Sequence, residues 1–283
     1  MDVSLHYIGA NGSILDLLHN PYFTTTVDGL TDVAAALSSS TTASMDGDRI
    51  NNVRAQPRGI VLDLSIKDSA NVEEAKQVIL RTIKHKQSGR LVFHHGGRDL
   101  EIVGIVNEIH MPRFVKGVKM QVSMHCSNPY WQDVENVLLE ISRVLNMHYF
   151  PIDQGGLAFP VGGVVMGEYD LNMTRTYTND GDAECGMVIT IIALDDVVNP
   201  TIYKADGSFI GVKDSMVSGD EIIINTNRGE KGITKNGANI LSKIKPGSKF
   251  LQLDTGDNVL TIDSDGDTAG NVYFMLSFKR RFV

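Results

Sequence analysis

Residues 60–66 read IVLDLSI, and apolar and polar side chains alternate through the second part of the stretch. Such alternation is typical of a half-buried β-strand. Further along, residues 91–95 and 100–106 are two apolar-rich runs on either side of a turn at Gly96-Gly97, and this pattern predicts a β-hairpin. The start of the chain is therefore predicted to be built on a sheet.

Helical spacing also occurs in this N-terminal block. Apolar residues recur at helical intervals over about 71–87, with Asn71 placed to cap the start and basic residues at the end, which predicts a helix packed across the sheet. A similar period predicts a second helix over about 133–146. Residues 115–126 alternate valine and methionine with polar side chains and predict another strand. Residues 1–150 are thus expected to form a β-rich α+β domain.

The second half of the chain has a different pattern. Glycine and proline gather in residues 151–163, and we place a domain boundary between residues 150 and 151. Short apolar strands and turns follow, including a predicted hairpin around 179–182, and they predict an antiparallel β-sandwich over residues 151–283. Residues 30–58, rich in serine, threonine, alanine and aspartate, are predicted to form a long hairpin or a mobile loop.

Composition excludes several classes of protein. The 283 residues are 42% hydrophobic and 21% charged, as in a globular chain rather than a disordered or collagen-like one. The net charge of −8 argues against nucleic acid as a specific partner. Residues 1–150 hold 14 basic and 16 acidic side chains, and residues 151–283 hold 12 and 18, so the second half is more acidic. We expect no signal peptide and no membrane span, because no basic and apolar leader and no run of 18 apolar residues occurs.

Histidine and cysteine do not predict a metal site. Adjacent His94 and His95 point to opposite faces of a strand and cannot share one ion. His110, His125 and Cys126 contain no closely spaced ligand pair of the zinc type. The two cysteines of the chain lie far apart, so they form neither a disulfide framework nor a metal knuckle.

Other sequence motifs for metal binding or catalysis are incomplete or missing. The stretch 263–267 (DSDGD) begins like a calcium loop, but its glycine is fourth instead of sixth and Phe274 stands where such a loop needs glutamate. The sequence contains no GxxxxGK[ST], GxGxxG, HExxH or GxSxG motif. We therefore predict no catalytic, cofactor-binding or metal-binding residue and no cofactor. A binding or assembly protein is expected, and not an enzyme.

Four short motifs follow one another along most of the chain: residues 126–131 read CSNPYW, 199–202 read NPTI, 219–226 read GDEIIINT and 253–258 read LDTGDN. In this order they resemble the distal tail protein (Dit) family of long non-contractile-tailed bacteriophages, the siphovirus tail components. The resemblance implies a mainly β fold, with an N-terminal β-rich α+β ring-forming domain followed by a C-terminal galectin-like antiparallel β-sandwich.

The resemblance also implies a function in the virion. Members of the family form a homohexameric ring at the tail tip, which joins the tail tube protein to the tail-associated, tail-tip or fibre protein and to the receptor-binding apparatus of the baseplate. The tape measure protein is a further implied partner. The implied location is the phage tail tip, after synthesis in the cytoplasm of the host bacterium. Residues 30–58 would then supply a loop or hairpin for contacts with a neighbouring copy.

Two further segments could contribute to a ring interface, namely residues 14–18 (ILDLL) and the methionine-rich strand through Met120 and Met124, although both also fit a hydrophobic core. Alternative functions stay open. One is a carbohydrate-binding, galectin-like module that contacts host cell-surface glycan, which the lack of tryptophan in the sandwich weakens. A cell-wall hydrolase ranks lowest, because no acid/base pair stands out.

Overall fold

The computed structural model describes residues 3–19, 21–31, 33–43, 46–66, 72–111, 118–140, 143–145, 168–170, 174–266 and 268–283. The chain divides into two compact units. The first contains Met1–Glu135 together with Arg281–Val283, and the second contains Asn136–Arg280. The predicted boundary between residues 150 and 151 lies outside the described residues and stays a prediction.

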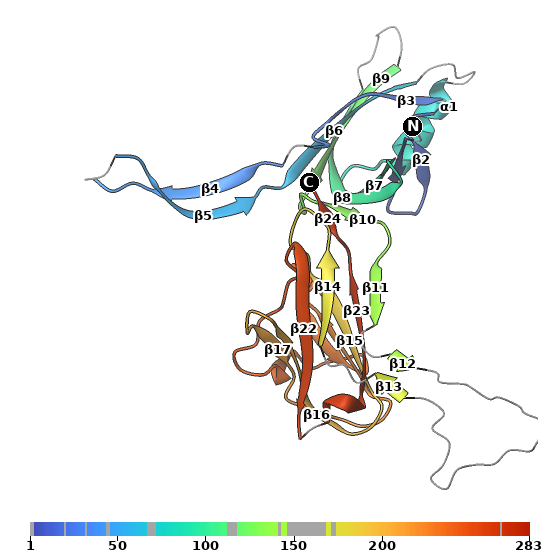
Figure 1. Cartoon of the computed structure of the whole chain (residues 1–283). Coiled ribbons are helices and arrows are strands. Elements are labelled where there is room, and N and C mark those ends of the chain that lie inside the picture. Colours follow the sequence, from blue (N-terminus) through green and yellow to red (C-terminus); the bar gives the residue numbers. More distant parts are fainter. Residues whose placement is uncertain are drawn as a thin grey trace, which may run out of the picture. The chain divides into compact units, whose positions relative to one another are not determined.

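The first unit is built on one nine-stranded sheet (Figure 1). Its strands are β1 (Ser4–Ile8), β2 (Ile14–Asp16), β3 (Tyr22–Asp28), β6 (Arg58–Ile66), β7 (Ser88–His95), β8 (Arg98–His110), β9 (Val118–Cys126), β10 (Trp131–Asp133) and β24 (Arg281–Phe282). The main path runs β2-β1-β7-β8-β9-β6-β3, and β10 pairs with both β8 and β24. The predicted hairpin is confirmed as β7–β8, and Gly96 and Gly97 take the positive φ values, 61° and 79°, that a tight two-residue turn requires.

One face of this sheet carries the core of the first unit. The helix α1 (Val72–Thr82) covers it and buries Ala75 and Ile79 among the apolar side chains of the strands. Acidic residues in the first turn and Arg81 in the last favour the helix through its dipole. The helix predicted over 71–87 is confirmed in place but ends at Thr82, and Lys86, at φ 66°, turns the chain toward β7.

The second unit packs two antiparallel sheets around a second core. The first sheet has the order β11-β23-β15-β19-β20-β21, and the second has the order β14-β22-β16-β17 with β18 beside β16. Their strands are β11 (Val137–Glu140), β14 (Thr174–Asn179), β15 (Met187–Ala193), β16 (Val197–Lys204), β17 (Phe209–Gly211), β18 (Ser215–Met216), β19 (Glu221–Asn225), β20 (Gly232–Lys235), β21 (Ala238–Asn239), β22 (Gly256–Asp265) and β23 (Val272–Phe278). Alternate residues of β15 and β23 are buried, as in a sandwich. The mainly β prediction is confirmed, and the galectin-like detail stays a prediction.

Two sequence predictions about this region are wrong. The helix predicted over 133–146 is replaced by β11, which pairs with β23, and by β12 (Arg143–Leu145), which pairs with β13 (Glu168–Asp170). The hairpin predicted around 179–182 does not form either. β14 pairs with β22 and β15 pairs with β19 and β23, so this turn leads from one sheet to the other. In both cases the strands pair with strands that are distant in sequence, and this pairing overrides the local pattern.

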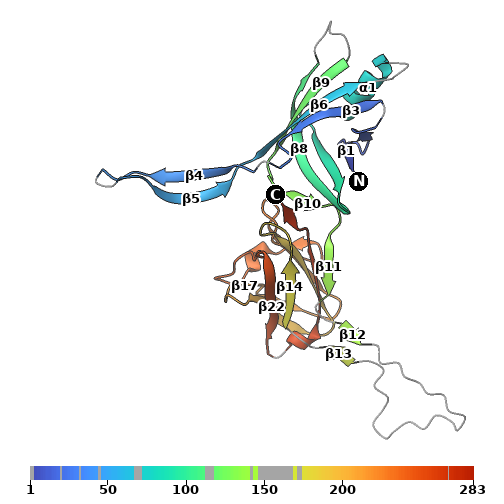
Figure 2. The same ribbon diagram turned by 45° about the horizontal axis from the view of Figure 1, so that its top comes forward.

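A separate two-stranded ribbon branches from the first unit. It consists of β4 (Ala35–Ser40) and β5 (Arg49–Ala55), and we call residues 35–55 the arm. Its strands pair only with each other among the described strands, and Figures 1 and 2 both show it leaving the nine-stranded sheet. The hairpin prediction for residues 30–58 is thereby confirmed. Among the helices that the described residues form, none combines the length and apolarity needed to cross a bilayer.

Candidate functional site

The arm has two chemically different faces. Leu37 lies opposite Val53 in the ladder, so these two side chains share one face. The register shifts between Ser38 and Ser39, because Asn51 is an extra residue in β5. As a result Ile50 lies opposite Ser39, on the face of Leu37, and not on the other face where strict alternation would place it. We call Leu37, Ile50 and Val53 the apolar arm face.

The apolar arm face is open to solvent. Leu37 is 63% exposed, Ile50 56% and Val53 58%. A two-stranded ribbon has no second layer in which to bury such side chains, and isolated ribbons are marginally stable in water. Contiguous exposed apolar patches are typical of interaction surfaces, which makes this face a candidate docking surface.

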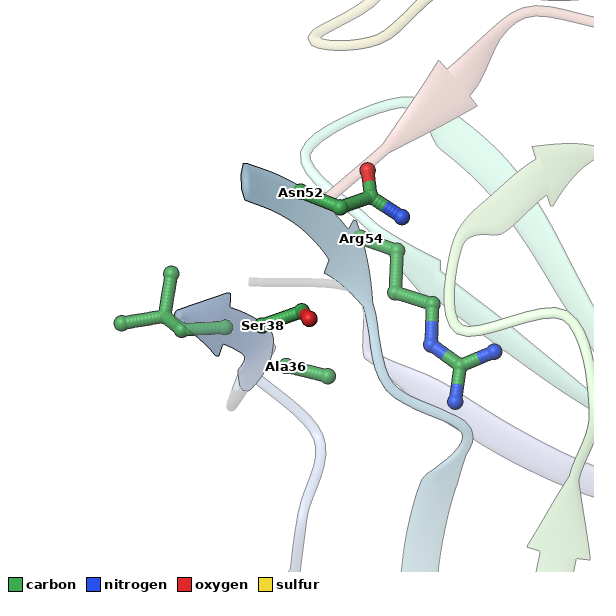
Figure 3. Close-up of a pocket in the computed structure, with 5 residues that line it drawn as sticks. Ala36, Ser38, Asn52 and Arg54 are labelled. Carbon is green, nitrogen blue, oxygen red and sulfur yellow. The ribbon is translucent and has the colours of Figure 1, made fainter. Parts of the chain in front are cut away.

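The opposite face of the arm is polar and basic. Figure 3 shows Ala36, Ser38, Asn52 and Arg54 around a shallow hollow. The small side chains of Ala36 and Ser38 leave this space, and the Asn52 amide and the Arg54 guanidinium border it. Arg49 lies on the same face, opposite Ser40. The arm is therefore amphipathic, with one apolar and one basic side.

The base of the arm is tied to the first unit by hydrogen bonds. The Leu30 carbonyl oxygen accepts a bond from Nη1 of buried Arg58 at 2.5 Å and from Nε1 of Trp131 at 2.9 Å. At Gly29, where φ is +81°, a side chain would collide with the Gly59 carbonyl oxygen, so the two backbone segments approach closely here. These contacts set the direction in which the arm leaves the sheet. They also give the CSNPYW motif, through Trp131, a structural role.

A second exposed apolar patch lies on the face of the sheet opposite α1. Val103 and Ile105 of β8 are each 48% exposed. In the ladders Val103 is opposite Arg90 of β7, and Ile105 is opposite His125 of β9. We call Val103 and Ile105 the outer sheet patch. Elsewhere on this face polar groups bond to each other, as where Asp63 accepts hydrogen bonds from Thr26 at 2.6 Å and Gln121 at 3.0 Å.

The other two candidate interface segments lie mainly in the core. In the segment 14–18, Leu15 and Leu17 are buried, whereas Ile14 is 66% exposed. Met120 and Met124 are buried in the core of the first unit. For both segments the structure favours the hydrophobic core over a ring interface, except at Ile14.

The motif NPTI lies inside β16, where the pairing with β22 shifts in register between Val198 and Thr201. Asn199 adopts a left-handed conformation at φ 53°, which asparagine tolerates better than most residues, and its Nδ2 donates to Asp265 at 2.6 Å. The hydrogen bond from Asn199 and the charge of Lys245 lower the pKa of Asp265. Asn199 therefore supports β16 at its link to β22.

The motif GDEIIINT begins with a turn that Asp220 holds. The Asp220 carboxylate pairs with Lys235 at 2.8 Å and accepts hydrogen bonds from the Val217 N–H at 3.0 Å and from Nδ2 of Asn236 at 2.8 Å. These contacts, the Lys235 hydrogen bond first, hold the pKa of the Asp220 carboxyl well below its ordinary value. Ile222 and Ile224 of the same motif are buried in the core, as their alternation predicts.

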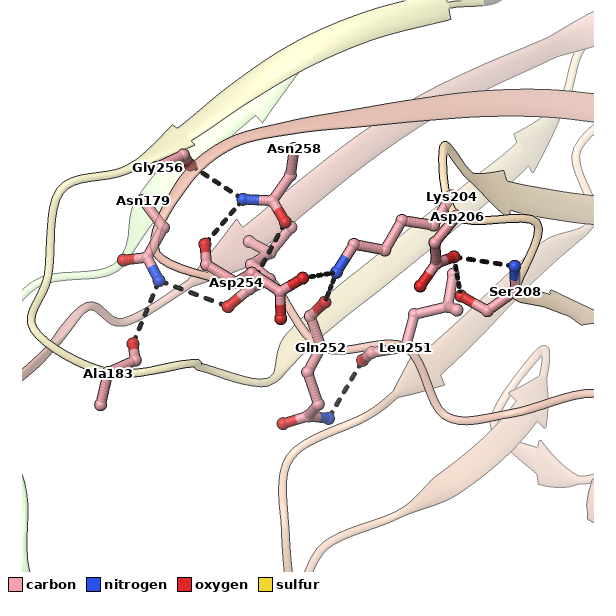
Figure 4. Close-up of polar contacts among 11 residues, drawn as sticks. Asn179, Ala183, Lys204, Asp206, Ser208, Leu251, Gln252, Asp254, Gly256 and Asn258 are labelled. Carbon is pink, nitrogen blue, oxygen red and sulfur yellow. Dashed lines mark hydrogen bonds and ion pairs between the residues drawn. The ribbon is translucent and has the colours of Figure 1, made fainter.

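The motif LDTGDN closes the loop before β22 (Figure 4). Asn258 accepts a hydrogen bond from the Asp254 N–H at 2.8 Å and donates to the carbonyl oxygens of Asp254 and Gly256 at 2.8 and 2.9 Å. Nearby, buried Asn179 donates to the carbonyl oxygens of Ala183 and Leu253. Both asparagines satisfy backbone groups and so act as structural residues.

The metal candidates from the sequence do not converge. His94 forms a hydrogen bond with Asp99 at 2.5 Å. Asp265, in the calcium-like stretch 263–267, accepts a hydrogen bond from Asn199 and forms an ion pair with Lys245. Burial raises the pKa of the Cys126 thiol to about 11, and Cys126 lies on the core side of the sheet whereas the neighbouring His125 is exposed. In the part of the chain that the structure describes, no group of three histidine, cysteine or acidic side chains could hold an ion. Asp267 lies outside the described residues.

The chain resembles known proteins in sequence family and in fold. Residues 180–282 match the family model for the C-terminal domain of the siphovirus-type tail component. No curated protein sequence matches the chain. Among solved structures, it is similar to the Dit protein of phage SPP1, described as a paradigm of the hub adsorption apparatus in phages that infect Gram-positive bacteria, with a TM-score of 0.69, 13% identity and 100% of both chains covered.

A chain of the phage P2 baseplate in its activated conformation with Ca is also similar, with a TM-score of 0.56, 13% identity and 100% of both chains covered. The same baseplate with Sr gives a TM-score of 0.53 and 12% identity over 100% of both chains. These matched proteins are phage structural proteins. Residues 180–282 thus match the C-terminal domain of siphovirus-type tail components, and the chain shares its fold from end to end with the Dit protein of phage SPP1, which agrees with the resemblance that its motifs carry.

Proposed function

We propose that the chain is a structural protein of the siphophage virion that forms a hexameric ring at the distal end of the tail. The observation that carries this proposal is the fold, which is shared along the whole chain with the SPP1 Dit hub protein. The family match of residues 180–282 supports it independently. In this role the protein joins the tail tube to the tail-tip or baseplate and receptor-binding apparatus, and it has no catalytic task.

The arm supports ring formation on physical grounds. A cyclic ring repeats one heterologous interface, so each copy needs one surface that reaches out and a different surface that receives. The arm leaves its own sheet and exposes three large apolar side chains. Since full burial of such a side chain is worth about 1.5–3 kcal/mol, covering the exposed half of each contributes about 1 kcal/mol or more per residue.

Partners and location follow from the same proposal. The first unit forms the ring and docks the tail tube protein, and the opposite side of the ring holds the tail-tip or fibre protein, with the tape measure protein as a further partner. The protein is made in the bacterial cytoplasm and ends in the tail tip. A galectin-like character of residues 151–283 and binding of host glycan stay predictions.

Native mass spectrometry with negative-stain microscopy of the purified chain tests the proposal. We expect a species of about 186 kDa, six copies of 31.0 kDa, with a central hole. A single 31.0 kDa species at every concentration would contradict ring formation. If that monomer also bound a glycan array tightly, the carbohydrate-binding alternative would replace the ring proposal.

A further inference from the structure

We propose that Asn236 is a deamidation site and that the Asp220 carboxylate keeps it unreactive in the folded protein. The reaction is a hydrolysis, and water is its only co-reactant. Asp220 thus protects the sandwich chemically, besides holding the turn before β19. The inference concerns the second unit alone and does not depend on the proposed ring.

Asn236 and Gly237 form the two-residue turn between β20 and β21. Both have positive φ values, 48° and 80°, and the ladder closes around them at Lys235 and Ala238, as in a type I′ hairpin. Asparagine is among the thermolabile residues, and a following glycine favours deamidation because it has no side chain to obstruct the approach of its nitrogen. Both residues are exposed, so water reaches them.

The reaction takes place within this turn. The Gly237 nitrogen forms a bond to Cγ of Asn236 and gives up its proton, and Nδ2 leaves with that proton as ammonia. The product is a five-membered succinimide ring. Water then opens the ring at one of its two carbonyl carbons, which leaves aspartate or isoaspartate at position 236.

Three hydrogen bonds hold Asn236 in its place. Its Oδ1 accepts a bond from the Glu221 N–H at 2.8 Å, and its Nδ2 donates to Oδ1 of Asp220 at 2.8 Å. Its backbone N–H donates to the Glu221 carbonyl oxygen at 2.9 Å. Because ring closure requires the Asn236 amide to swing onto the Gly237 nitrogen, both side-chain bonds must break first. The bond to Asp220 is the stronger of the two, since its acceptor is charged.

Asp220 can hold this amide because other groups fix the carboxylate itself, namely Lys235 at 2.8 Å and the Val217 N–H at 3.0 Å. Conversion of Asn236 removes the Nδ2 donor and places a second carboxylate within hydrogen-bond distance of Asp220, where like charges repel. An isoaspartate also adds one backbone atom to a two-residue turn. The conversion therefore weakens this corner of the sheet, and refolding does not reverse it.

The chain carries a second Asn-Gly pair that serves as an internal reference. Asn11 and Gly12 are exposed. Oδ1 of Asn11 accepts bonds from the Ser13 N–H at 3.2 Å and Oγ at 2.6 Å, and the Gly12 N–H donates to the Gly9 carbonyl oxygen at 2.9 Å. These contacts lie within one short loop of the first unit. A variant that changes only the contacts of Asn236 should therefore leave the rate at Asn11 unchanged.

Mass spectrometry of proteolytic peptides tests the proposal by following both pairs while the full chain is incubated at neutral pH. In the wild-type chain we expect Asn236 to convert at least about tenfold more slowly than in the same chain unfolded in guanidinium chloride. Asp220→Ala should raise the rate at Asn236 about tenfold, the effect of one lost hydrogen bond to a charged group. The matched control is Lys235→Met, which removes the ion pair of Asp220 but leaves both side-chain bonds of Asn236, and it should stay near the wild-type rate.

Several results would overturn the proposal. If Asn236 stayed intact in the unfolded chain, it would not be a deamidation site, and equal rates in the folded and unfolded chains would show that the fold does not protect it. An Asp220→Ala rate equal to the wild-type rate, or a Lys235→Met rate equal to that of Asp220→Ala, would show that the bond from Asn236 to Asp220 is not what protects.

The rate at Asn11 shows whether Asp220→Ala has simply unfolded the chain. If both pairs accelerated to their rates in guanidinium chloride, unfolding would be the cause. Asp220→Asn, which keeps an oxygen acceptor for Nδ2 of Asn236 but loses the charge, then gives the decisive measurement. A rise at Asn236 alone would support the protective role of the carboxylate, and no rise would overturn it.

Discussion

At the scale of single residues, Asp220 shows how the sandwich depends on buried and half-buried polar contacts. Its carboxylate holds the turn before β19 through Lys235, Val217 and Asn236. The pKa of this carboxyl in the folded protein is lower than its ordinary value of 3.8, so the contacts stabilise the fold above about pH 4 and are lost as the pH falls below that. We expect Asp220→Asn to lower the midpoint of urea unfolding at pH 7 and to flatten its decline between pH 4 and 2.

The matched control for this prediction is Asp195→Asn, an exposed residue of the same unit whose carboxylate accepts a hydrogen bond from the adjacent Asp196 N–H. We expect it to leave the unfolding midpoint nearly unchanged at pH 7. If Asp220→Asn kept the full acid sensitivity of the wild-type chain, other carboxylates with lowered pKa, such as Asp214 and Asp265, would be its source.

Three motif residues of the sandwich show which local features the sequence could predict and which it could not. Asp220 directly follows the turn at residues 218–219, whereas Asn199 lies inside β16 and Asn258 inside β22, where turns were predicted; all three satisfy neighbouring polar groups. Their hydrogen-bond partners could not be predicted. Asp265 lies 66 positions from Asn199, and its place beside that residue depends on the pairing of β16 with β22.

At the scale of elements, one β-bulge places Ile50 on the apolar arm face. Inserting one alanine between Ser38 and Ser39 would pair Asn51 with the new residue, restore strict alternation and move Ile50 to the polar face. We expect the ring to need about tenfold higher protein concentration for half-assembly, because an Ile side chain about half exposed no longer contributes about 1–2 kcal/mol to the contact. Sedimentation over a dilution series measures this midpoint.

Deleting Asn51 is the matched control for the insertion. The deletion also removes the bulge, but it leaves Ile50 opposite Ser39 on the apolar arm face. We expect it to assemble much like the wild-type chain. Equal loss of assembly in both variants would show that the local twist of the bulge matters more than the side on which Ile50 lies.

Strand pairing explains which elements the sequence could predict. β6 and the β7–β8 hairpin were predictable, because alternation and a Gly-Gly turn are local signals. β11 was not, since its apolar spacing also fits a helix and its partner β23 lies about 140 positions away in the sequence. The arm was predictable as a hairpin, but its faces were not. The position of Ile50 on these faces depends on a register shift at Asn51, which the local sequence pattern does not predict.

At the scale of the whole molecule, the chain passes between its two units twice, because β24 returns to the sheet of the first unit. Phe282 is buried beside Trp131, the one tryptophan of the chain. Tryptophan fluorescence therefore reports the first unit alone. We expect Phe282→Ala to lower the free energy of unfolding followed by this signal by roughly 3 kcal/mol, as large-to-small changes in a core do.

The rest of the molecule supplies the controls for this prediction. Val283→Ala changes an exposed side chain one residue further on and should leave the fluorescence transition unchanged. Amide exchange in β15 and β23 should be equally slow in both variants, because the sandwich core does not include Phe282. If Phe282→Ala destabilised the sandwich strands as much as the tryptophan transition, the two units would unfold as one, and the second chain crossing at residues 280–281 would be the connection that couples them.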